Sequence, residues 1–263
     1  MMECGIYDFI GLSGRGLSKD AFSFELKKED ISFMDLSSSV KGKNKIPYFK
    51  ANIESIKDYY SIKDIRRLDK YARMFLLICA GLLKNIKEEE KENTGVVLGT
   101  SYGSFKTNCD FLDSIIFQGF EYASPMLFTG TVHNSPLAPL GMFKGIKGPS
   151  YSISNFEKTF ESALYVSSTL LLKEMSSKVL MVFVDEISPL LLYGFSNILN
   201  IDENNPKSIP QEGGCGFLLE KGEGIMGLEK IWGFIMEKGK YPKHYGFTYY
   251  PEAFDLLIYL NTL

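Results

Sequence analysis

The sequence feature that most constrains the fold is a strand pattern that passes directly into a helix pattern over residues 148–172. Tyr151 and Ile153 alternate with hydroxyl-bearing neighbours at the period of two that indicates a β-strand. Downstream, apolar residues mark one side of a helix, namely Phe156, Phe160, Ala163, Leu164, Leu170 and Leu171. Such a junction places one residue beside the free N–H groups of a helix N-terminus, where negative charge is favoured. Here that residue is Glu157, in a place where many enzymes carry a nucleophile.

Strand and helix patterns alternate along the rest of the chain. Short apolar runs bounded by glycine or polar residues predict strands at 4–10, 95–100, 179–184, 213–220 and 227–236. Helical periodicity predicts helices at 64–84, 105–117 and 251–260. This order predicts an α/β fold with a largely parallel sheet. The polar, proline-bearing stretch 200–210 is the best candidate for a boundary.

Composition limits the classes of function. A net charge of −3 over 263 residues gives no reason to expect nucleic acid or an anionic membrane as a partner. The four cysteines are far apart and form no Cys-x-x-Cys pair, which argues against a zinc site or a disulfide framework and favours a reducing compartment. We find no secretory leader and no apolar stretch long enough to span a bilayer, so we expect a cytoplasmic protein.

Three motifs upstream of the junction carry a resemblance to a known family. They are Ser124-Pro125-Met126-Leu127-Phe128, then Thr131-Val132-His133-Asn134, then the glycines of Gly145-Ile146-Lys147-Gly148-Pro149. With the junction itself, they resemble the β-ketoacyl synthases of the thiolase superfamily. Gly99-Thr100 with Gly103, and the run Glu212-Gly213-Gly214-Cys215-Gly216, are similar to further synthase motifs.

The resemblance implies a truncated thiolase-like fold. Residues 1–200 correspond to the N-terminal half of a synthase, and residues 201–263 to a short start of the second half, with two strands and a helix. The two parts are expected to pack as one globular unit. Because most of the second half is missing, the resemblance also implies an apolar surface that needs a partner.

By the same resemblance, Glu157 occupies the position of the catalytic cysteine. The two histidines of the family's reaction belong to the missing region, and this chain has only His133 and His244, neither in a matching motif. Ketoacyl synthase activity is therefore not expected from this chain alone.

Glu157 has a structural and a chemical interpretation. Ser154 and Glu157 match a capping box, in which both side chains satisfy backbone N–H groups at a helix start. Alternatively, the carboxylate acts as an acid, a base or a thioester mimic, which would make the protein a small thioester hydrolase or decarboxylase. The structural interpretation is favoured, because a catalytic carboxylate needs partners.

The run Val132-His133-Asn134 looks like the short synthase relatives known as chain-length factors in aryl-polyene pathways. That resemblance implies a non-catalytic subunit that pairs with an active ketosynthase and with an acyl carrier protein. It implies no cofactor of its own, because acyl chains arrive on the phosphopantetheine of the carrier. A scaffold that holds a synthase and a carrier without affecting chain length is a further alternative.

The resemblance also implies a set of residues that line a tunnel or a subunit interface. By position, the tunnel gate falls on Asn108 and Leu127. Beside them lie Phe105, Met126, Phe128, His133 and Asn134, and Tyr151 and Ile153 belong to the strand that meets the other subunit. The same residues would also suit an ordinary core, and His133 alone would suit a core or interface histidine that bonds backbone.

Overall fold

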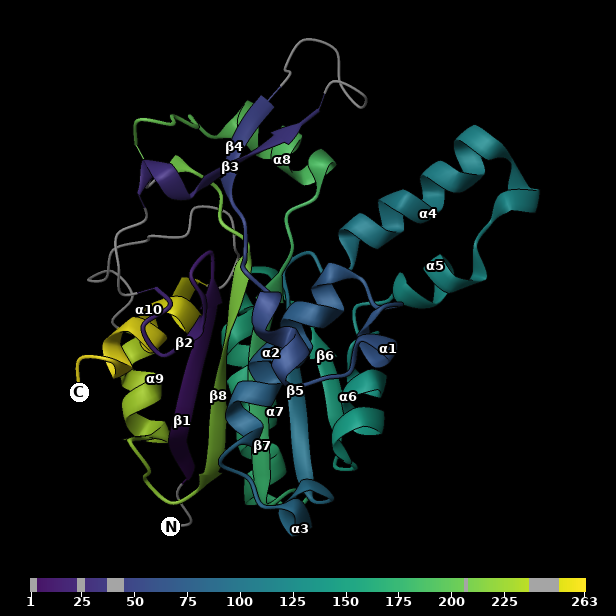
Figure 1. Ribbon diagram of the computed structural model, residues 1–263. Helices are drawn as coiled ribbons and strands as arrows, with labels where there is room; N and C mark the ends of the chain where they lie inside the picture. The colour runs from purple at the N-terminus through teal and green to yellow at the C-terminus, as the bar shows by residue number, and fades with distance from the viewer. Residues whose placement is uncertain (1–3, 23–26, 37–44, 206–207, 237–250) are drawn as a thin grey trace.

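The computed structural model describes residues 4–22, 27–36, 45–205, 208–236 and 251–263. His244 therefore lies outside the described residues. The chain forms a twisted central sheet with helices on both faces, a small second sheet, and a helical arm that extends away from the body (Figure 1).

The central sheet has the strand order β2-β1-β8-β7-β5-β6, and β9 also pairs with β1. Its strands are β1 (Cys4–Ser13), β2 (Gly16–Ser18), β5 (Thr94–Gly99), β6 (Ser150–Ile153), β7 (Lys178–Asp185), β8 (Gly213–Lys221) and β9 (Met226–Gly227). The β7–β5 and β5–β6 pairs are parallel, as expected for strands joined through helices. β8 runs antiparallel to both β7 and β1. The predicted α/β class is confirmed, and β8 places the 201–263 segment inside the same sheet as the rest.

One face of the sheet is covered by α2 (Lys70–Leu83) and α6 (Leu137–Lys144). Twelve of the fourteen α2 residues are buried, as expected for a helix that is apolar on nearly all sides. The sequence predicts one helix over 64–84, but the structure has α1 (Ile62–Ile65) and a break before α2. The break is caused by Asp69, whose carboxylate accepts the Ala72 N–H at 2.8 Å and caps a new helix.

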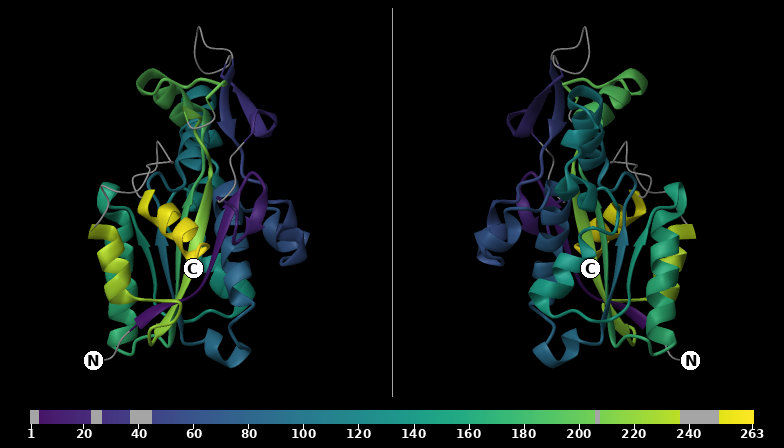
Figure 2. Two further views of the ribbon diagram at one scale, coloured as in Figure 1. Left: turned by 90° about the vertical axis from the view of Figure 1, so that its left-hand side faces the viewer. Right: turned by 90° about the vertical axis from the view of Figure 1, so that its right-hand side faces the viewer.

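The other face is covered by α7 (Thr159–Leu172), α9 (Leu228–Met236) and α10 (Pro251–Leu260), as the edge-on views in Figure 2 show. At its centre Phe160, Phe183 and Phe217 pack with ring centroids 5.4–6.5 Å apart. The predicted strand over 227–236 is wrong: only Met226–Gly227 is extended, and the rest is helix α9. Its apolar residues lie at helical spacing, at Leu228, Ile231, Trp232 and Ile235.

α9 and α10 supply cover that the sequence analysis expected from a partner. Ile231, Phe234, Ile235, Leu256 and Leu257 are all buried in the same cluster as Phe217 and Leu219 of β8. The apolar face of the sheet is therefore closed to a large extent from within the chain.

A smaller layer lies beyond the carboxyl ends of β5 and β7. It consists of β3 (Ile31–Asp35), which pairs antiparallel with β4 (Lys45–Phe49), and of α8 (Pro189–Ile198). Leu36, Ile46, Tyr48, Ile187 and Leu192 form its core. The remaining short elements are connections: η1 (Lys28–Asp30), η2 (Glu54–Asp58) and α3 (Glu88–Lys91).

The helical arm consists of α4 (Phe105–Gln118), η3 (Phe120–Tyr122) and α5 (Pro125–Gly130). Figure 1 shows α4 and α5 running side by side, away from the sheet. Large apolar side chains are exposed along the arm, namely Leu112, Ile116, Phe117, Phe120, Tyr122, Met126 and Phe128. Their exposed fractions run from 53% to 83%, so the arm contributes little to the core of this chain.

The C-terminus of α7 generates a stability prediction. Glu174 follows α7 with φ 58°, in the left-handed region, and the next N–H, of Met175, returns to Leu170 O at 2.9 Å. Glycine suits such a position, because a Cβ costs about 1 kcal/mol there. We expect Glu174→Gly to have a higher free energy of unfolding than Glu174→Ala by about that amount. Both variants lose the ion pair with Lys221, so urea denaturation of the two isolates the backbone effect. An alanine variant as stable as the glycine variant would contradict this prediction.

Candidate functional site

The junction between β6 and α7 contains a 3₁₀ turn, η4 (Phe156–Lys158). The α-helix then begins at Thr159, with Lys158 at the N-cap. The Asn155 N–H donates to Thr159 Oγ1 at 2.9 Å, and the Asn155 amide donates to Ser162 Oγ at 2.9 Å. The predicted capping box of Ser154 and Glu157 is therefore wrong, because Asn155 and Thr159 organise the helix start instead.

Glu157 lies in that turn with an exposed side chain. Within the described part of the chain its carboxylate forms no hydrogen bond or ion pair, while the neighbouring Lys158 pairs with Glu161 at 3.2 Å. A solvated carboxylate without an orienting partner is poorly suited to acid–base or nucleophilic chemistry. The arrangement gives no support to a hydrolase or decarboxylase that uses Glu157.

His133 is held at a different place, against the turn that follows β5. Its ring packs over Gly103, where φ is 57° and a Cβ would lie 2.2 Å from His133 Cδ2. The Tyr71 hydroxyl donates to the His133 carbonyl at 3.0 Å. The main chain at His133 therefore has a structural contact, and Gly103 provides the space that its ring needs.

The arm carries both predicted gate residues, Asn108 on α4 and Leu127 on α5. The Asn108 amide, half-buried, donates to the Thr131 carbonyl at 2.7 Å and to the Ser104 carbonyl at 3.1 Å, so it joins α4 to the end of α5. Phe105 and Leu127 are half-buried, whereas Met126 and Phe128 are about 60% exposed. The Phe128 ring lies 5.6 Å from that of Phe111 on α4.

Strand β6, which precedes the junction, lies apart from the arm residues. β6 is the last strand of the sheet on its side, and Tyr151 is 44% exposed there. Ile153 packs against the core on the α7 face. Asn134 is exposed in the turn before α6. The predicted set thus divides into an arm group and an edge-strand group.

The structure adds an acidic cluster at the carboxyl end of β7. Asp185 accepts from Thr100 Oγ1 at 2.7 Å, from the Tyr102 N–H at 2.9 Å and from the Ser101 N–H at 3.1 Å. These bonds fix the turn that leads from β5 into the arm. Because all three donors point at one carboxylate, Asp185 is fully occupied by the fold.

Next to Asp185, Glu186 and Glu212 surround Lys70 at the start of α2. Glu212 is 1% exposed and accepts from the Lys70 ammonium, from the Ala51 N–H at 3.0 Å and from the Ile187 N–H at 3.3 Å. Burial raises the pKa of Glu186 to about 7 and lowers the pKa of Lys70 to about 8, since a desolvated group favours its neutral form. Asp69 raises the pKa of Glu186 further.

Comparison with known proteins places the chain in a family. Residues 63–200, just over half of the chain, match the family described as beta-ketoacyl synthase, N-terminal domain. The chain belongs to this family. The resemblance predicted from the Ser124–Phe128 motif and the junction is therefore confirmed, and so is the thiolase-like fold.

A curated relative of this ketoacyl synthase domain is 3-oxoacyl-[acyl-carrier-protein] synthase I, chloroplastic, of Hordeum vulgare. The two are 24% identical over 193 residues, which cover 67% of this chain and 42% of the relative. The chain thus spans less than half the length of the relative that it matches.

Two solved structures share the fold. The ishigamide ketosynthase/chain length factor matches with a TM-score of 0.65 and 19% identity, over 84% of this chain and 63% of that one. The ketosynthase ApeO in complex with its chain length factor ApeC, from Xenorhabdus doucetiae, matches with a TM-score of 0.56 and 20% identity. That match covers 84% of this chain and 80% of the other.

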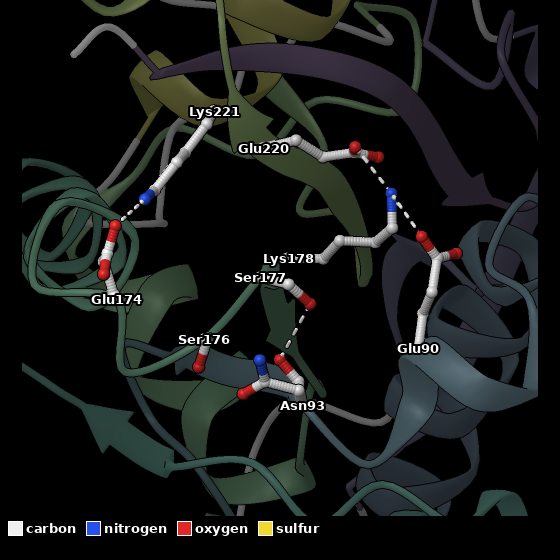
Figure 3. Close-up of a pocket in the computed structure, with 8 residues that line it drawn as sticks. All are labelled: Glu90, Asn93, Glu174, Ser176, Ser177, Lys178, Glu220 and Lys221. Carbon is white, nitrogen blue, oxygen red and sulfur yellow. Dashed lines mark hydrogen bonds and ion pairs between the residues drawn. The ribbon is translucent and has the colours of Figure 1, made fainter.

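The ketoacyl synthase domain also has a charged pocket of about 380 Å³ at the opposite end of the parallel strands (Figure 3). Lys178 pairs there with Glu220 at 2.5 Å and with Glu90 at 3.5 Å, and Lys221 pairs with Glu174 at 2.7 Å. Both lysines of the pocket are paired, and its three glutamates leave one negative charge in excess, so the pocket is a structural ion-pair cluster. Over the described ranges there is no group of His, Cys, Asp and Glu side chains that could hold a metal ion, and no helix long and apolar enough to cross a membrane.

The sequence analysis did not identify the cluster around Lys70. Glu212 appears there only in the motif Glu212-Gly213-Gly214-Cys215-Gly216, and Asp185 and Glu186 directly follow the strand predicted over 179–184. Lys70 and Glu212 lie 142 positions apart, and neither has a local pattern that points to the other. The one local signal was Asp69 ahead of an apolar run, which is typical of an N-cap.

The contrast between Glu157 and Glu212 can be tested by two matched substitutions. Glu157→Gln should change the free energy of unfolding by less than about 0.5 kcal/mol, as expected for an exposed side chain. Glu212→Gln should cost about 3 kcal/mol, because it leaves the Lys70 ammonium half-buried without its carboxylate. Chemical denaturation at neutral pH measures both. A larger loss in the Glu157 variant would show that this carboxylate has a structural role not seen in the fold.

Proposed function

We propose that the chain is a non-catalytic ketosynthase-like subunit, of the chain-length-factor type, that pairs with an active β-ketoacyl synthase. The observation that carries the proposal is Glu157. In a chain that belongs to the ketoacyl synthase family, the position assigned to the nucleophile holds an exposed carboxylate, and no thiolate is available there to hold an acyl group.

Two surfaces support a partner subunit. Exposed apolar side chains run along the arm, and extended patches of this kind mark interaction sites on folded proteins. β6 ends the sheet with an open edge, which offers backbone groups to another strand. A second ketosynthase-type subunit would cover both, and two structural relatives are named as ketosynthases with chain length factors.

The proposed role defines the substrate and its delivery. Acyl chains would reach the pair on the phosphopantetheine of an acyl carrier protein, and this chain would need no cofactor of its own. We propose polyketide or fatty-acid-type elongation, with an aryl polyene pathway as the specific setting, in the cytoplasm. Four free cysteines agree with a reducing compartment.

Without a nucleophilic thiol at the junction, the purified chain should form no acyl-enzyme. We expect its intact mass to stay unchanged after incubation with acyl-CoA or acyl-carrier donors, while a cysteine-containing ketosynthase treated in parallel gains the acyl mass. An acyl adduct mapped to Glu157 would overturn the non-catalytic assignment.

Leu127 tests the proposed effect on chain length. If its half-buried side chain borders the acyl channel of the pair, Leu127→Ala should permit longer products and Leu127→Phe should shorten them, because a packed wall resists even small added volume. The measurement is mass spectrometry of products from the reconstituted pair with carrier protein. Leu172→Ala, at the exposed end of α7 and outside the arm, is the control.

Asn108 is a weaker probe than Leu127, since its amide holds α4 to Thr131 and a Phe there would also move the arm. An unchanged product distribution in both Leu127 variants, with the complex intact, would leave the scaffold role in place of chain-length control.

A further inference from the structure

The attachment of the arm to the body depends on the first residues of α2. Thr107 Oγ1, on α4, donates to Asp69 Oδ2 at 2.6 Å. The Tyr71 hydroxyl donates to the carbonyl of His133, just beyond α5, at 3.0 Å. Asn108 connects the two sides of the arm between these points. A shift of residues 69–71 would therefore be transmitted to both ends of the arm.

Glu186 lies next to these residues, because Asp185 before it holds the turn from β5 into the arm and Ile187 after it donates its N–H to Glu212, the partner of Lys70. Glu186 is 6% exposed, and the pKa of its carboxyl group responds to Asp69, Lys70, the Tyr71 N–H and, on the arm, Lys106. The other titratable and charged groups around it come from the elements packed nearby, namely Tyr48, Lys50, Asp185 and Glu212.

The carboxylates of this cluster differ in how many hydrogen bonds they receive. Asp185 and Glu212 each accept from three donors, and Asp69 accepts from the Ala72 N–H and from Thr107. At Glu186 the Tyr71 N–H is the backbone donor that lowers the pKa, and the attraction of Lys70 is shared with Glu212. A negative charge is stabilised by the donors that point at it, so Glu186 is the carboxyl group of this cluster that most readily takes up a proton.

We propose that the carboxyl group of Glu186 is a proton-operated latch that fixes the arm when protonated and loosens it when ionised. Ionisation places a second negative charge beside Asp69, the residue that holds Thr107. The repulsion acts on the start of α2, where both ties of the arm are made. Because the arm carries exposed apolar side chains, the latch would make any surface built on them sensitive to pH.

The direction of the pH effect follows from the raised pKa of Glu186. Burial is the largest cause and Asp69 the next, and together they outweigh Lys70, Lys106 and the Tyr71 N–H, which act in the opposite direction. With a pKa of about 7, the folded protein holds this proton below neutral pH and loses it as pH rises. Detachment of the arm returns Glu186 to an ordinary carboxyl pKa. Detachment is therefore favoured as pH increases through neutrality.

Hydrogen exchange of the whole chain tests the latch without a partner. The measurement uses peptides within residues 105–131, with exchange rates corrected for intrinsic exchange. We expect their protection to fall by about tenfold between about pH 6 and about pH 8. This is the pH dependence expected when one carboxyl group regains its ordinary pKa as the arm detaches. In Glu186→Gln the step should vanish. In Glu220→Gln, a carboxylate paired with Lys178 at the far end of the sheet, it should persist.

A second variant covers the case in which Glu186→Gln does not fold. Thr107→Val removes the tie to Asp69 and leaves the acidic cluster intact, so it should lower protection of α4 at acidic pH and remove the pH step. The proposal is overturned if wild-type protection is the same at both pH values. It is also overturned if the full step persists in Glu186→Gln or in Thr107→Val.

Discussion

The buried ion pair between Lys70 and Glu212 holds together the segments that meet at the carboxyl end of β7. Its carboxylate accepts from Ala51 after β4, from Ile187 after β7 and from Lys70 at the start of α2, so one side chain connects three separate segments. Glu212 itself directly precedes β8, and its N–H donates to Phe49 O at 3.0 Å. The small β3–β4 layer, the sheet and α2 thus meet at one desolvated charge. A charge removed from water in this way is tolerated only when paired and hydrogen-bonded, which ties the positions of these segments to one another.

The sheet explains how a chain that spans less than half of its curated relative still closes a core. β8 lies between β1 and β7, so residues from the two ends of the sequence pair at the centre of the sheet. α9 and α10 then bury Phe217 and Leu219 on the face shared with α7. The arm and the edge strand β6 keep exposed apolar side chains, and those are the surfaces on which a partner is proposed. The buried core thus stabilises the fold, while the exposed arm and β6 are the parts proposed to interact with a partner.

Much of the central architecture could be predicted from sequence, because it depends on local pattern. The apolar runs of β5 and β7 and the β6–α7 junction follow from periodicity, and the motif from Ser124 to Phe128 pointed to the correct family. The errors have physical causes. Ser154 and Glu157 match a capping box, but residues 156–158 form a 3₁₀ turn, the Asn155 N–H is bound by Thr159, and the α-helix begins only at Thr159. The 227–236 stretch is apolar enough for a strand, but its spacing fits a helix that packs on β8. The Lys70 cluster joins residues far apart in sequence, which no local pattern reveals.

The positions of the charged groups indicate which part of the molecule is important for function. The β6–α7 junction carries an exposed Glu157, and the ring of His133 packs against Gly103 away from that junction. The desolvated groups with shifted pKa values, Glu186 and Lys70, lie near Asp69, which accepts the hydrogen bond of Thr107 on α4. Buried groups with shifted pKa values lower the stability of the folded protein, and they tend to occur at functional sites. The arm that these groups adjoin carries exposed apolar side chains, so the two proposals made above, for a partner subunit and for a pH-dependent arm, concern the same part of the molecule.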